Sequence, residues 1–355
     1  MVGTVFSGKF FDRNGVLWPL LIGTIVSVGS LLGMANATTV YQFVLAFGVG
    51  LGGATGVLMA PIIGAVSHYF RKAERATPLA IAGTGGCVGG VLFPAMLRKS
   101  YKSIGFVWSM RCVALIDLVC LCVCILLVKE RKLSEKQKLT LGQKVKLYAL
   151  KSFDFAALLV DRPYLFNVMG CVFAEGTVII TSSYFSFICV KNGFSESEAY
   201  LYVTIINVLA VVGRYLSGVI ADKYVGSYNV IIFSLFITGV ADLVMWMPFK
   251  DNTVALWVYS VFYGFFYGGI FSLIPNCCSQ IVKADIFGSR YATMYAVAGF
   301  CLLGFMPASS SLIGNGWDNS RNDGFIIFAA GMSFISGSSY LITRTMSVGW
   351  TLKKF

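Results

Sequence analysis

The sequence predicts an all-α, polytopic membrane protein with about ten transmembrane helices. Two features of its composition indicate this: 57% of the 355 residues are hydrophobic, and only 12% are charged. A soluble domain typically carries about 25% charged residues, so most of this chain is expected to contact lipid. The third observation is spacing, because apolar runs close to the ~20 residues that a membrane helix needs recur between short polar breaks.

The predicted spans follow one another along the chain. The apolar runs place them at 16–34, 41–69, 77–97, 106–128, 163–189, 199–221, 229–248, 254–280, 290–313 and 324–345. The longest polar break, 129–162, carries nine basic residues. We therefore expect an N-terminal helical half at 1–128, a basic cytoplasmic loop at 129–162 and a C-terminal helical half at 163–355.

The net charge of +12 is explained by the loops between the spans. Of the 28 Lys and Arg residues, 20 lie in alternate breaks, at 9–15, 71–76, 129–162, 222–228, 281–290 and in the tail from Arg344. The positive-inside rule assigns these breaks to the cytoplasm. Because the charge is divided among short loops and does not form one water-exposed basic face, we expect no nucleic-acid partner.

The sequence lacks the residue patterns of an enzyme or a metal protein. Its ten cysteines lie mostly in apolar stretches without a C-x-x-C pair, and His68 is the single histidine. Neither a Walker lysine motif nor a nucleophile elbow is present. We therefore expect no enzymatic activity, no metal and no cofactor. The sequence assigns no oligomeric state.

An internal repeat relates the two halves. "GTVFSGKFFDR" at 3–13 and "GRYLSGVIADK" at 213–223 share the pattern G-x-x-x-S-G-x-x-x-D-[RK], each at the expected cytoplasmic end of a span. Two spans precede the second copy and none precedes the first. The repeat therefore predicts a twelve-helix architecture with two pseudo-symmetric halves, from which this sequence lacks the first helix and most of the second.

These residues resemble the major facilitator superfamily. The resemblance rests on the two cytoplasmic turns, with Gly8, Asp12, Arg13 and Gly15 in the first and Gly218, Asp222 and Lys223 in the second. The segment "YFRKAERATPLAIAGTGG" from Tyr69 and the segment "FGSRYATMYAVAGFCLLGFMP" from Phe287 are similar to the fifth and eleventh helices of the monocarboxylate-transporter-like branch, particularly its fungal permease homologues. The resemblance implies a secondary active transporter that works by alternating access.

The glycines after the basic cluster at 71–75 are interpreted as helix-packing residues. Ala82, Gly86 and Gly90 recur at i, i+4 and i+8, which predicts a smooth face on a membrane helix. Gly48, Gly52 and Gly56 do the same on the preceding span. Phosphate binding is disfavoured, since no strand and no Lys-Ser/Thr pair flank these glycines.

Arg214 is the main candidate for substrate binding. It lies eight residues before Asp222, about 12 Å from the membrane surface and near the middle of a ~30 Å hydrocarbon core. Such an arginine is expected to face a cavity or an ionic partner. The resemblance implies an arginine on this helix that binds the substrate carboxylate, and an aspartate one turn earlier, where this chain has Ala210.

Glu175, at a depth close to that of Arg214, and three residues on neighbouring turns or helices are further candidates. Glu175 is expected either to couple protons to transport or to form a static ion pair with Arg214. Asn207 lies two turns before Arg214 and offers a neutral hydrogen bond. Tyr263 and Tyr267 share a helix face with Tyr259, and this face either lines the cavity for a planar substrate or serves packing alone.

Asp12, Arg13, Asp222 and Lys223 are expected to gate the cytoplasmic side or simply to cap helices. The combined prediction is a secondary transporter of a small organic anion, for which a monocarboxylate is one candidate. If transport is coupled to protons, the protein is a symporter. It would lie in the plasma membrane or the vacuolar membrane, with the lipid bilayer and a small-molecule substrate as its partners. Two alternatives remain: a transporter of another small organic solute, and a membrane remnant or sensor that transports nothing.

Overall fold

The computed structural model describes residues 7, 10–11, 15–128, 155–283, 286–313, 320–350 and 354–355. These residues form helices and connecting turns, with no strand among them. Each of the ten predicted spans overlaps a helix long and apolar enough to cross a membrane, namely Leu17–Ala35, Val40–Ser67, Ala76–Ser103, Gly105–Leu127, Arg162–Lys191, Glu196–Val225, Ser227–Trp246, Thr253–Ile281, Phe287–Leu312 and Asn322–Val348. The all-α, multi-pass membrane fold is therefore confirmed.

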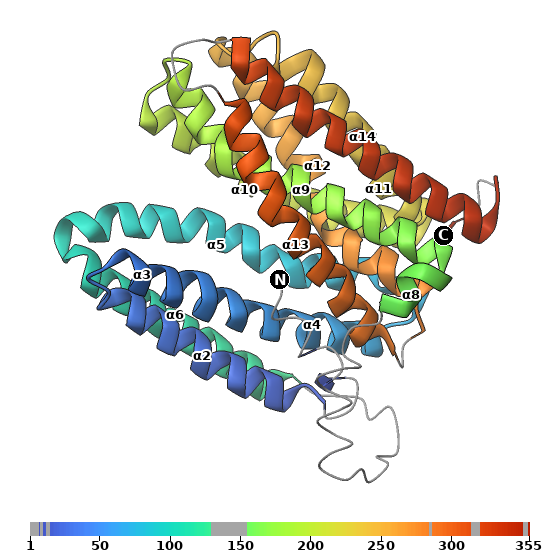
Figure 1. Cartoon of the computed structure of the whole chain (residues 1–355), viewed down its shortest axis with the longest axis horizontal. Helices are drawn as coiled ribbons and strands as arrows, with labels where there is room; N and C mark the ends of the chain where they lie inside the picture. Colours follow the sequence, from blue (N-terminus) through green and yellow to red (C-terminus); the bar gives the residue numbers. More distant parts are fainter. Residues whose placement is uncertain are drawn as a thin grey trace. The chain divides into compact units, whose positions relative to one another are not determined.

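The chain divides into two compact units (Figure 1). Unit 1 comprises Met1–Arg71, Leu92–Ala156 and Val282–Ala296, and unit 2 comprises Lys72–Val91, Ala157–Ile281 and Val297–Phe355. Unit 1 holds α2 (Leu17–Ala35), α3 (Val40–Phe43), η1 (Val44–Leu51), α4 (Gly52–Tyr69), α6 (Gly105–Leu127) and parts of α5 (Ala76–Ser103) and α13 (Phe287–Leu312). Unit 2 holds the rest of α5 and α13 together with η2 (Lys72–Glu74), most of α8 (Phe155–Val160), α9 (Arg162–Lys191), α10 (Glu196–Ile220), η3 (Ala221–Val225), α11 (Ser227–Ala241), η4 (Asp242–Trp246), α12 (Thr253–Ile281) and α14 (Ser320–Val348).

In unit 1, helix α2 packs against α4 and α6. Leu31 and Met34 of α2 meet Met110 of α6 in one apolar cluster. The membrane-depth carboxylate of Asp117 is also satisfied at this contact, because the Ser27 hydroxyl donates to it over 2.6 Å. The α2–α6 contact thus combines apolar burial with the hydrogen bond that a polar group needs inside a membrane.

The helices of unit 2 begin at residues suited to capping. The Asp161 carboxylate accepts a hydrogen bond from the Tyr164 amide and starts α9. Ser195 and Glu198 form a reciprocal capping box at the start of α10. Gly226 precedes α11 with a φ of 90°, a conformation that favours glycine. The local sequence therefore sets where these three helices begin.

Helices α10 and α12 approach each other closely because glycines line their contact. A Cβ atom added to Gly264 would lie 2.6 Å from the carbonyl oxygen of Ile206. Cβ atoms added to Gly213 and Gly268 would come closer still to the backbone carbonyls of Phe265 and Ala210. In a membrane, where lipid removes the hydrophobic drive for helix association, such close backbone packing holds helices together.

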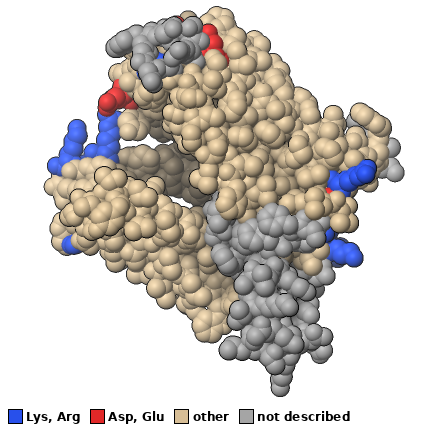
Figure 2. All heavy atoms as spheres, viewed as in Figure 1, with Lys and Arg blue, Asp and Glu red and all other residues tan. Residues whose placement is uncertain are grey.

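An aromatic core lies between α9, α11, η4, α12 and α14. The ring of Trp246 lies at its centre, with centroid separations of 5.2 Å to Phe185, 5.3 Å to Tyr259 and 6.1 Å to Phe325. Figure 1 shows α11, α12 and α14 close together, as their direct contacts require. At one end of the unit Lys250 and Asp323 form an ion pair of 2.7 Å. Figure 2 shows a face on which described charged side chains are few and uncharged residues predominate.

Gly268→Ala tests the α10–α12 contact. The added methyl group would overlap the Ala210 carbonyl, and overpacking typically costs about 1–3 kcal/mol. We expect a lower melting temperature in detergent micelles. Gly331→Ala on α14 is the matched control, because no neighbouring heavy atom lies within 4 Å of a Cβ atom added there and alanine favours helix. Equal melting temperatures for the two variants would contradict the close packing.

Candidate functional site

Arg214 is buried in unit 2, with 5% of its surface exposed. Its Nη1 atom donates to the carbonyl oxygen of Gly83 on α5 over 2.8 Å. Its Cζ atom lies 4.9 Å from the ring centroid of Phe271 on α12, a cation–π contact. Its Nε has no hydrogen-bond partner among the described residues. A guanidinium has five N–H donors, so this one keeps donors for a further acceptor.

A row of aromatic rings runs along α12 to Arg214. Tyr259, Tyr263, Tyr267 and Phe271 lie on successive turns, with centroid separations of 5.3, 5.9 and 6.4 Å. Tyr259 and Tyr263 are fully buried in the aromatic core, whereas Tyr267 and Phe271 are partly exposed. The row therefore passes from the core of unit 2 to the guanidinium of Arg214, and only its Arg214 end reaches an accessible surface.

Asn207 faces α5 from α10. Its Nδ2 atom donates to the Val203 carbonyl over 3.0 Å, and a Cβ atom added to Gly90 would lie 2.9 Å from its Oδ1 atom. Asn207 and Arg214 thus meet the same helix two turns apart, at Gly90 and Gly83.

The small-residue face predicted on α5 is shifted in the structure. No heavy atom lies within 4 Å of a Cβ added to Gly86, whereas Ala80, Gly83 and Gly90 face α10. The positions that face α10 repeat at about seven residues, which is two turns of an α-helix, so Gly86 points about 60° away from them. The sequence pattern identified a small-residue helix and placed Gly90 correctly on its packing face, but it was wrong for Gly86, because glycines occur on several sides of α5.

Glu175 is fully buried on α9. It lies within electrostatic range of Tyr267, as Arg214 does, and also of Cys171 and Tyr340. None of the contacts described for Arg214 is with a carboxylate. Glu175 and Arg214 therefore have Tyr267 as a common neighbour.

Asp222 in η3 caps helix α5. Its Oδ1 atom accepts from the Ala76 amide over 3.0 Å, and its Oδ2 atom accepts from the Thr77 amide over 2.7 Å. A carboxylate at a helix N-terminus satisfies free N–H groups and opposes the helix dipole. Lys354 also donates to the Asp222 backbone carbonyl. Lys223 is exposed, and Asp12 and Arg13 lie outside the described residues.

A second contact at this end was missed by sequence reasoning. Lys72 Nζ donates to the Gln280 carbonyl, and Gln280 Nε2 donates to the Lys72 carbonyl, each over 2.8 Å. Burial, and secondarily the charge of Arg75, lower the pKa of Lys72. The two residues are 208 positions apart, so no local pattern announces the pair.

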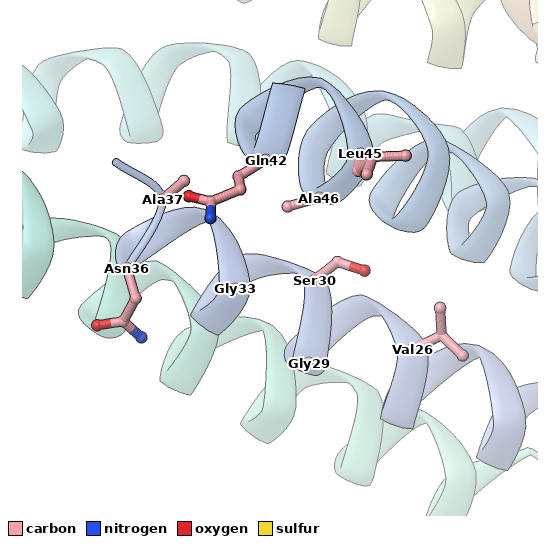
Figure 3. Close-up of a pocket in the computed structure, with 9 residues that line it drawn as sticks. All are labelled: Val26, Gly29, Ser30, Gly33, Asn36, Ala37, Gln42, Leu45 and Ala46. Carbon is pink, nitrogen blue, oxygen red and sulfur yellow. The ribbon is translucent and has the colours of Figure 1, made fainter. Parts of the chain in front are cut away.

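Unit 1 contains a separate groove of about 640 Å³ between α2 and the α3–η1 segment (Figure 3). It is lined by Val26, Gly29, Ser30, Gly33, Asn36, Ala37, Gln42, Leu45 and Ala46. Its amide oxygens already accept hydrogen bonds, Gln42 from the Thr38 amide and Asn36 from Arg111. None of the lining residues is charged, and none was a predicted site residue.

The described residues contain no group of three or more His, Cys, Asp or Glu that could hold a metal ion. In the Arg214 region a buried charge, an aromatic surface and the amide of Asn207 lie along the same pair of helices. Such a combination suits the binding of a small polar solute.

Residues 1–304 match the family described as the Major Facilitator Superfamily. The riboflavin transporter MCH5 of Saccharomyces cerevisiae is 37% identical, in an alignment covering 99% of this chain and 69% of that protein. A fujikurins efflux protein of Gibberella fujikuroi is 26% identical, with 95% and 70% covered.

Solved structures of low sequence identity share the fold. The human organic anion transporter MFSD10 superposes with a TM-score of 0.73 at 13% identity, covering 96% of this chain and 80% of that one. The E. coli fucose:proton symporter FucP superposes with a TM-score of 0.70 at 14% identity, covering 97% and 87%.

Asp222→Asn tests the cap on α5. Asparagine keeps one acceptor oxygen but loses the charge, so we expect the free energy of unfolding to fall by about 0.3–2 kcal/mol, the contribution of a charge at a helix N-terminus. Chemical unfolding in detergent micelles measures it. Lys223→Gln is the matched control and is expected to change little, because Lys223 is exposed. Equal stability of the two variants would show that the Asp222 cap contributes nothing.

Proposed function

Because the chain belongs to the Major Facilitator Superfamily, we propose that it is a secondary active transporter of a small organic solute, which it binds at Arg214. The chain is a multi-pass integral membrane protein of a superfamily of transporters. Transport proceeds by alternating access, with an ion or solute gradient as the energy source. The observation that supports the proposal is that the buried Arg214 guanidinium has N–H donors without an acceptor among the described residues.

The substrate carries oxygen acceptors that match a guanidinium fork. Arg214 uses Nη1 for the Gly83 carbonyl, and its Nε has no partner within the described chain. A buried donor without an acceptor is costly, so an acceptor on the substrate gains the full value of this hydrogen bond. A carboxylate, or the carbonyl groups of a polar ring, fits this requirement.

The substrate also carries a planar ring. Tyr267 and Phe271 are the partly exposed rings next to Arg214, and they provide a flat surface on which a ring can stack. The relative that is 37% identical is a riboflavin transporter. Riboflavin combines a planar ring system with carbonyl oxygens, and it is the first substrate we assign to this site. Asn207 supplies a neutral hydrogen bond to it.

A small organic anion, a monocarboxylate in the simplest form, is the second candidate. The positive charge of Arg214 favours it, since a carboxylate would neutralise the guanidinium in a medium of low dielectric constant. The resemblance of the α5 segment to the monocarboxylate-transporter-like branch points the same way. In this version Glu175 couples protons to transport, because it shares the neighbour Tyr267 with Arg214.

Asp222 closes one end of the site during the transport cycle. It joins η3 to the start of α5, the helix that also provides the Gly83 carbonyl to Arg214. A movement of α5 that breaks the cap would therefore alter the Arg214 site as well. Lys223, and Arg13 in the first copy of the repeat, assist this gate by pairing with acidic groups, while Asp12 takes the capping role in that copy.

Arg214→Gln tests the assignment. The purified protein is reconstituted into liposomes, and uptake of labelled riboflavin and of labelled lactate is measured. We expect the variant to lose about 10- to 100-fold in kcat/KM, because a hydrogen bond to a charged group contributes about 1.5–3 kcal/mol. Arg214→Lys separates the candidates: it restores part of the uptake of an anion, but not of a ring that needs the planar fork.

Normal uptake by Arg214→Gln would overturn the binding role of this residue. Wild-type protein that takes up neither solute would exclude both substrates and leave the two alternatives, a transporter of another small organic solute and a membrane protein that transports nothing. Uptake by intact cells and by isolated vacuoles then assigns the plasma membrane or the vacuolar membrane.

Gly83→Ala probes the position of the guanidinium. The added Cβ would lie 2.5 Å from Arg214 Nη1, so the side chain must move away from the Gly83 carbonyl. We expect KM to rise about tenfold, equivalent to about 1.4 kcal/mol of binding. Gly86→Ala is the control, because nothing lies within 4 Å of its added methyl group. Equal KM values for both variants would mean that Arg214 does not bind substrate from this position.

A further inference from the structure

Asp242 is a buried carboxylate that the proposed site does not use. It is fully buried, and it stands where α11 passes into the π-helical segment η4. Asp242 lies about 22 Å along the helix from Ser227, so it is near the end of the span opposite to the Asp222 cap. Inside a membrane span, such a residue marks an ion or proton pathway more often than a structural role.

Among the described residues, the side chain of Asp242 accepts one hydrogen bond and forms no ion pair. The Tyr259 hydroxyl donates to its Oδ1 atom over 2.7 Å, and its Oδ2 atom has no hydrogen-bond partner in the described part of the chain. The elements packed against η4 are α11, α12 and α14. The titratable groups that face Asp242 are Tyr259 and Tyr263 of α12, with Cys189 of α9 next to Tyr259, and α14 contributes the apolar ring of Phe325.

These contacts favour the protonated carboxyl group. An ionised carboxylate without a cation is strongly disfavoured in an apolar interior, and one tyrosine hydroxyl does not replace the water that the ion would lose. A neutral carboxyl group keeps the Tyr259 hydrogen bond and avoids the burial of charge. Resting on the proposed transport function, we propose that Asp242 is a proton-binding site that is loaded in this conformation and discharges when the transport cycle admits water to it.

The aromatic row of α12 connects this proton site to the solute site. Tyr259 bonds to Asp242 at one end of the row, and Phe271 stacks under Arg214 at the other. A helix moves as a rigid unit over such a length, so a shift of α12 that opens the core around Asp242 also displaces Tyr267 and Phe271. Proton release and the state of the solute site are thereby linked.

The local backbone at Asp242 supports a role in such a change. Met247 donates its amide hydrogen to the Asp242 carbonyl over 2.9 Å, an i to i+5 bond of a π-helix. Short π-helical segments inside longer helices are found frequently at functional sites. Trp246, four residues after Asp242, packs its ring against Phe185 and Phe325 toward the end of the unit that bears Lys250 and Asp323. We assign proton access to that end.

Asp242→Asn is the direct test. Asparagine has nearly the same size and still accepts the Tyr259 hydrogen bond, but it does not exchange a proton. In liposomes, we expect a pH gradient to lose its ability to drive solute accumulation, while exchange of labelled for unlabelled solute continues. Tyr259→Phe leaves the carboxyl group in place, so we expect it to keep the coupling and to shift its pH dependence. Asp117→Asn in unit 1 is the matched control and keeps both activities.

A second measurement is independent of transport. The infrared carbonyl band of a protonated carboxyl group, recorded on purified protein at neutral pH, should be weaker in Asp242→Asn than in the wild type. An unchanged band would overturn the proposal, even if no transported solute is found and the proposed function fails. If Asp242→Asn is too unstable for uptake assays, Tyr259→Phe tests the proposal in its place. It should shift the pH at which the infrared carbonyl band disappears.

Transport data separate the two buried carboxylates. Accumulation driven normally by a pH gradient in Asp242→Asn would overturn the proposal. Loss of accumulation in Glu175→Gln, with normal accumulation in Asp242→Asn, would place proton coupling at Glu175 instead.

Discussion

An arginine buried in a membrane helix has to find its hydrogen-bond acceptors within the protein, because lipid offers none. Arg214 finds one on the backbone of α5 and an aromatic face on α12, so three helices of unit 2 are fixed around one guanidinium. The approach requires a residue without a side chain at Gly83. The glycines between α10 and α12 allow these helices to pack closely, and Phe271 of α12 thereby lies near enough to stack on the Arg214 guanidinium.

The remaining polar groups of unit 2 obey the same constraint, and each solution joins helices that are distant in sequence. Asp222 satisfies the first amides of α5, and Tyr228 donates to Asn167 of α9 and to the Cys277 carbonyl of α12. Where the constraint is met incompletely, as at Arg214 Nε and Asp242 Oδ2, the group is a candidate for binding a solute or a proton. We therefore expect functional residues where a buried polar atom lacks a hydrogen-bond partner within the described chain.

Membership of the Major Facilitator Superfamily fixes the architecture but not the solute. Proteins similar to this chain include a riboflavin transporter and an efflux protein, and the solved structures of similar fold act on an organic anion and on fucose. We therefore expect that a few side chains on the common helical scaffold determine which solute each protein binds. In the function proposed for this chain, Arg214, Asn207 and Tyr267 are the side chains that contact the solute.

The sequence alone determined the ten spans, because hydropathy and length suffice when backbone groups must be satisfied within each helix. It also identified Arg214, since a charge at membrane depth stands out in an apolar run. Tertiary structure alone decided which groups meet: Gly83 with Arg214, Asp222 with the start of α5, and Asp242 with Tyr259. The sequence assigned α5 a face of Ala82, Gly86 and Gly90; the structure places Gly90 at α10 together with Gly83, whereas Gly86 has no neighbour within 4 Å of an added Cβ atom. Rotation and partner choice depend on contacts between segments that are up to 208 residues apart, and a local pattern does not contain that information.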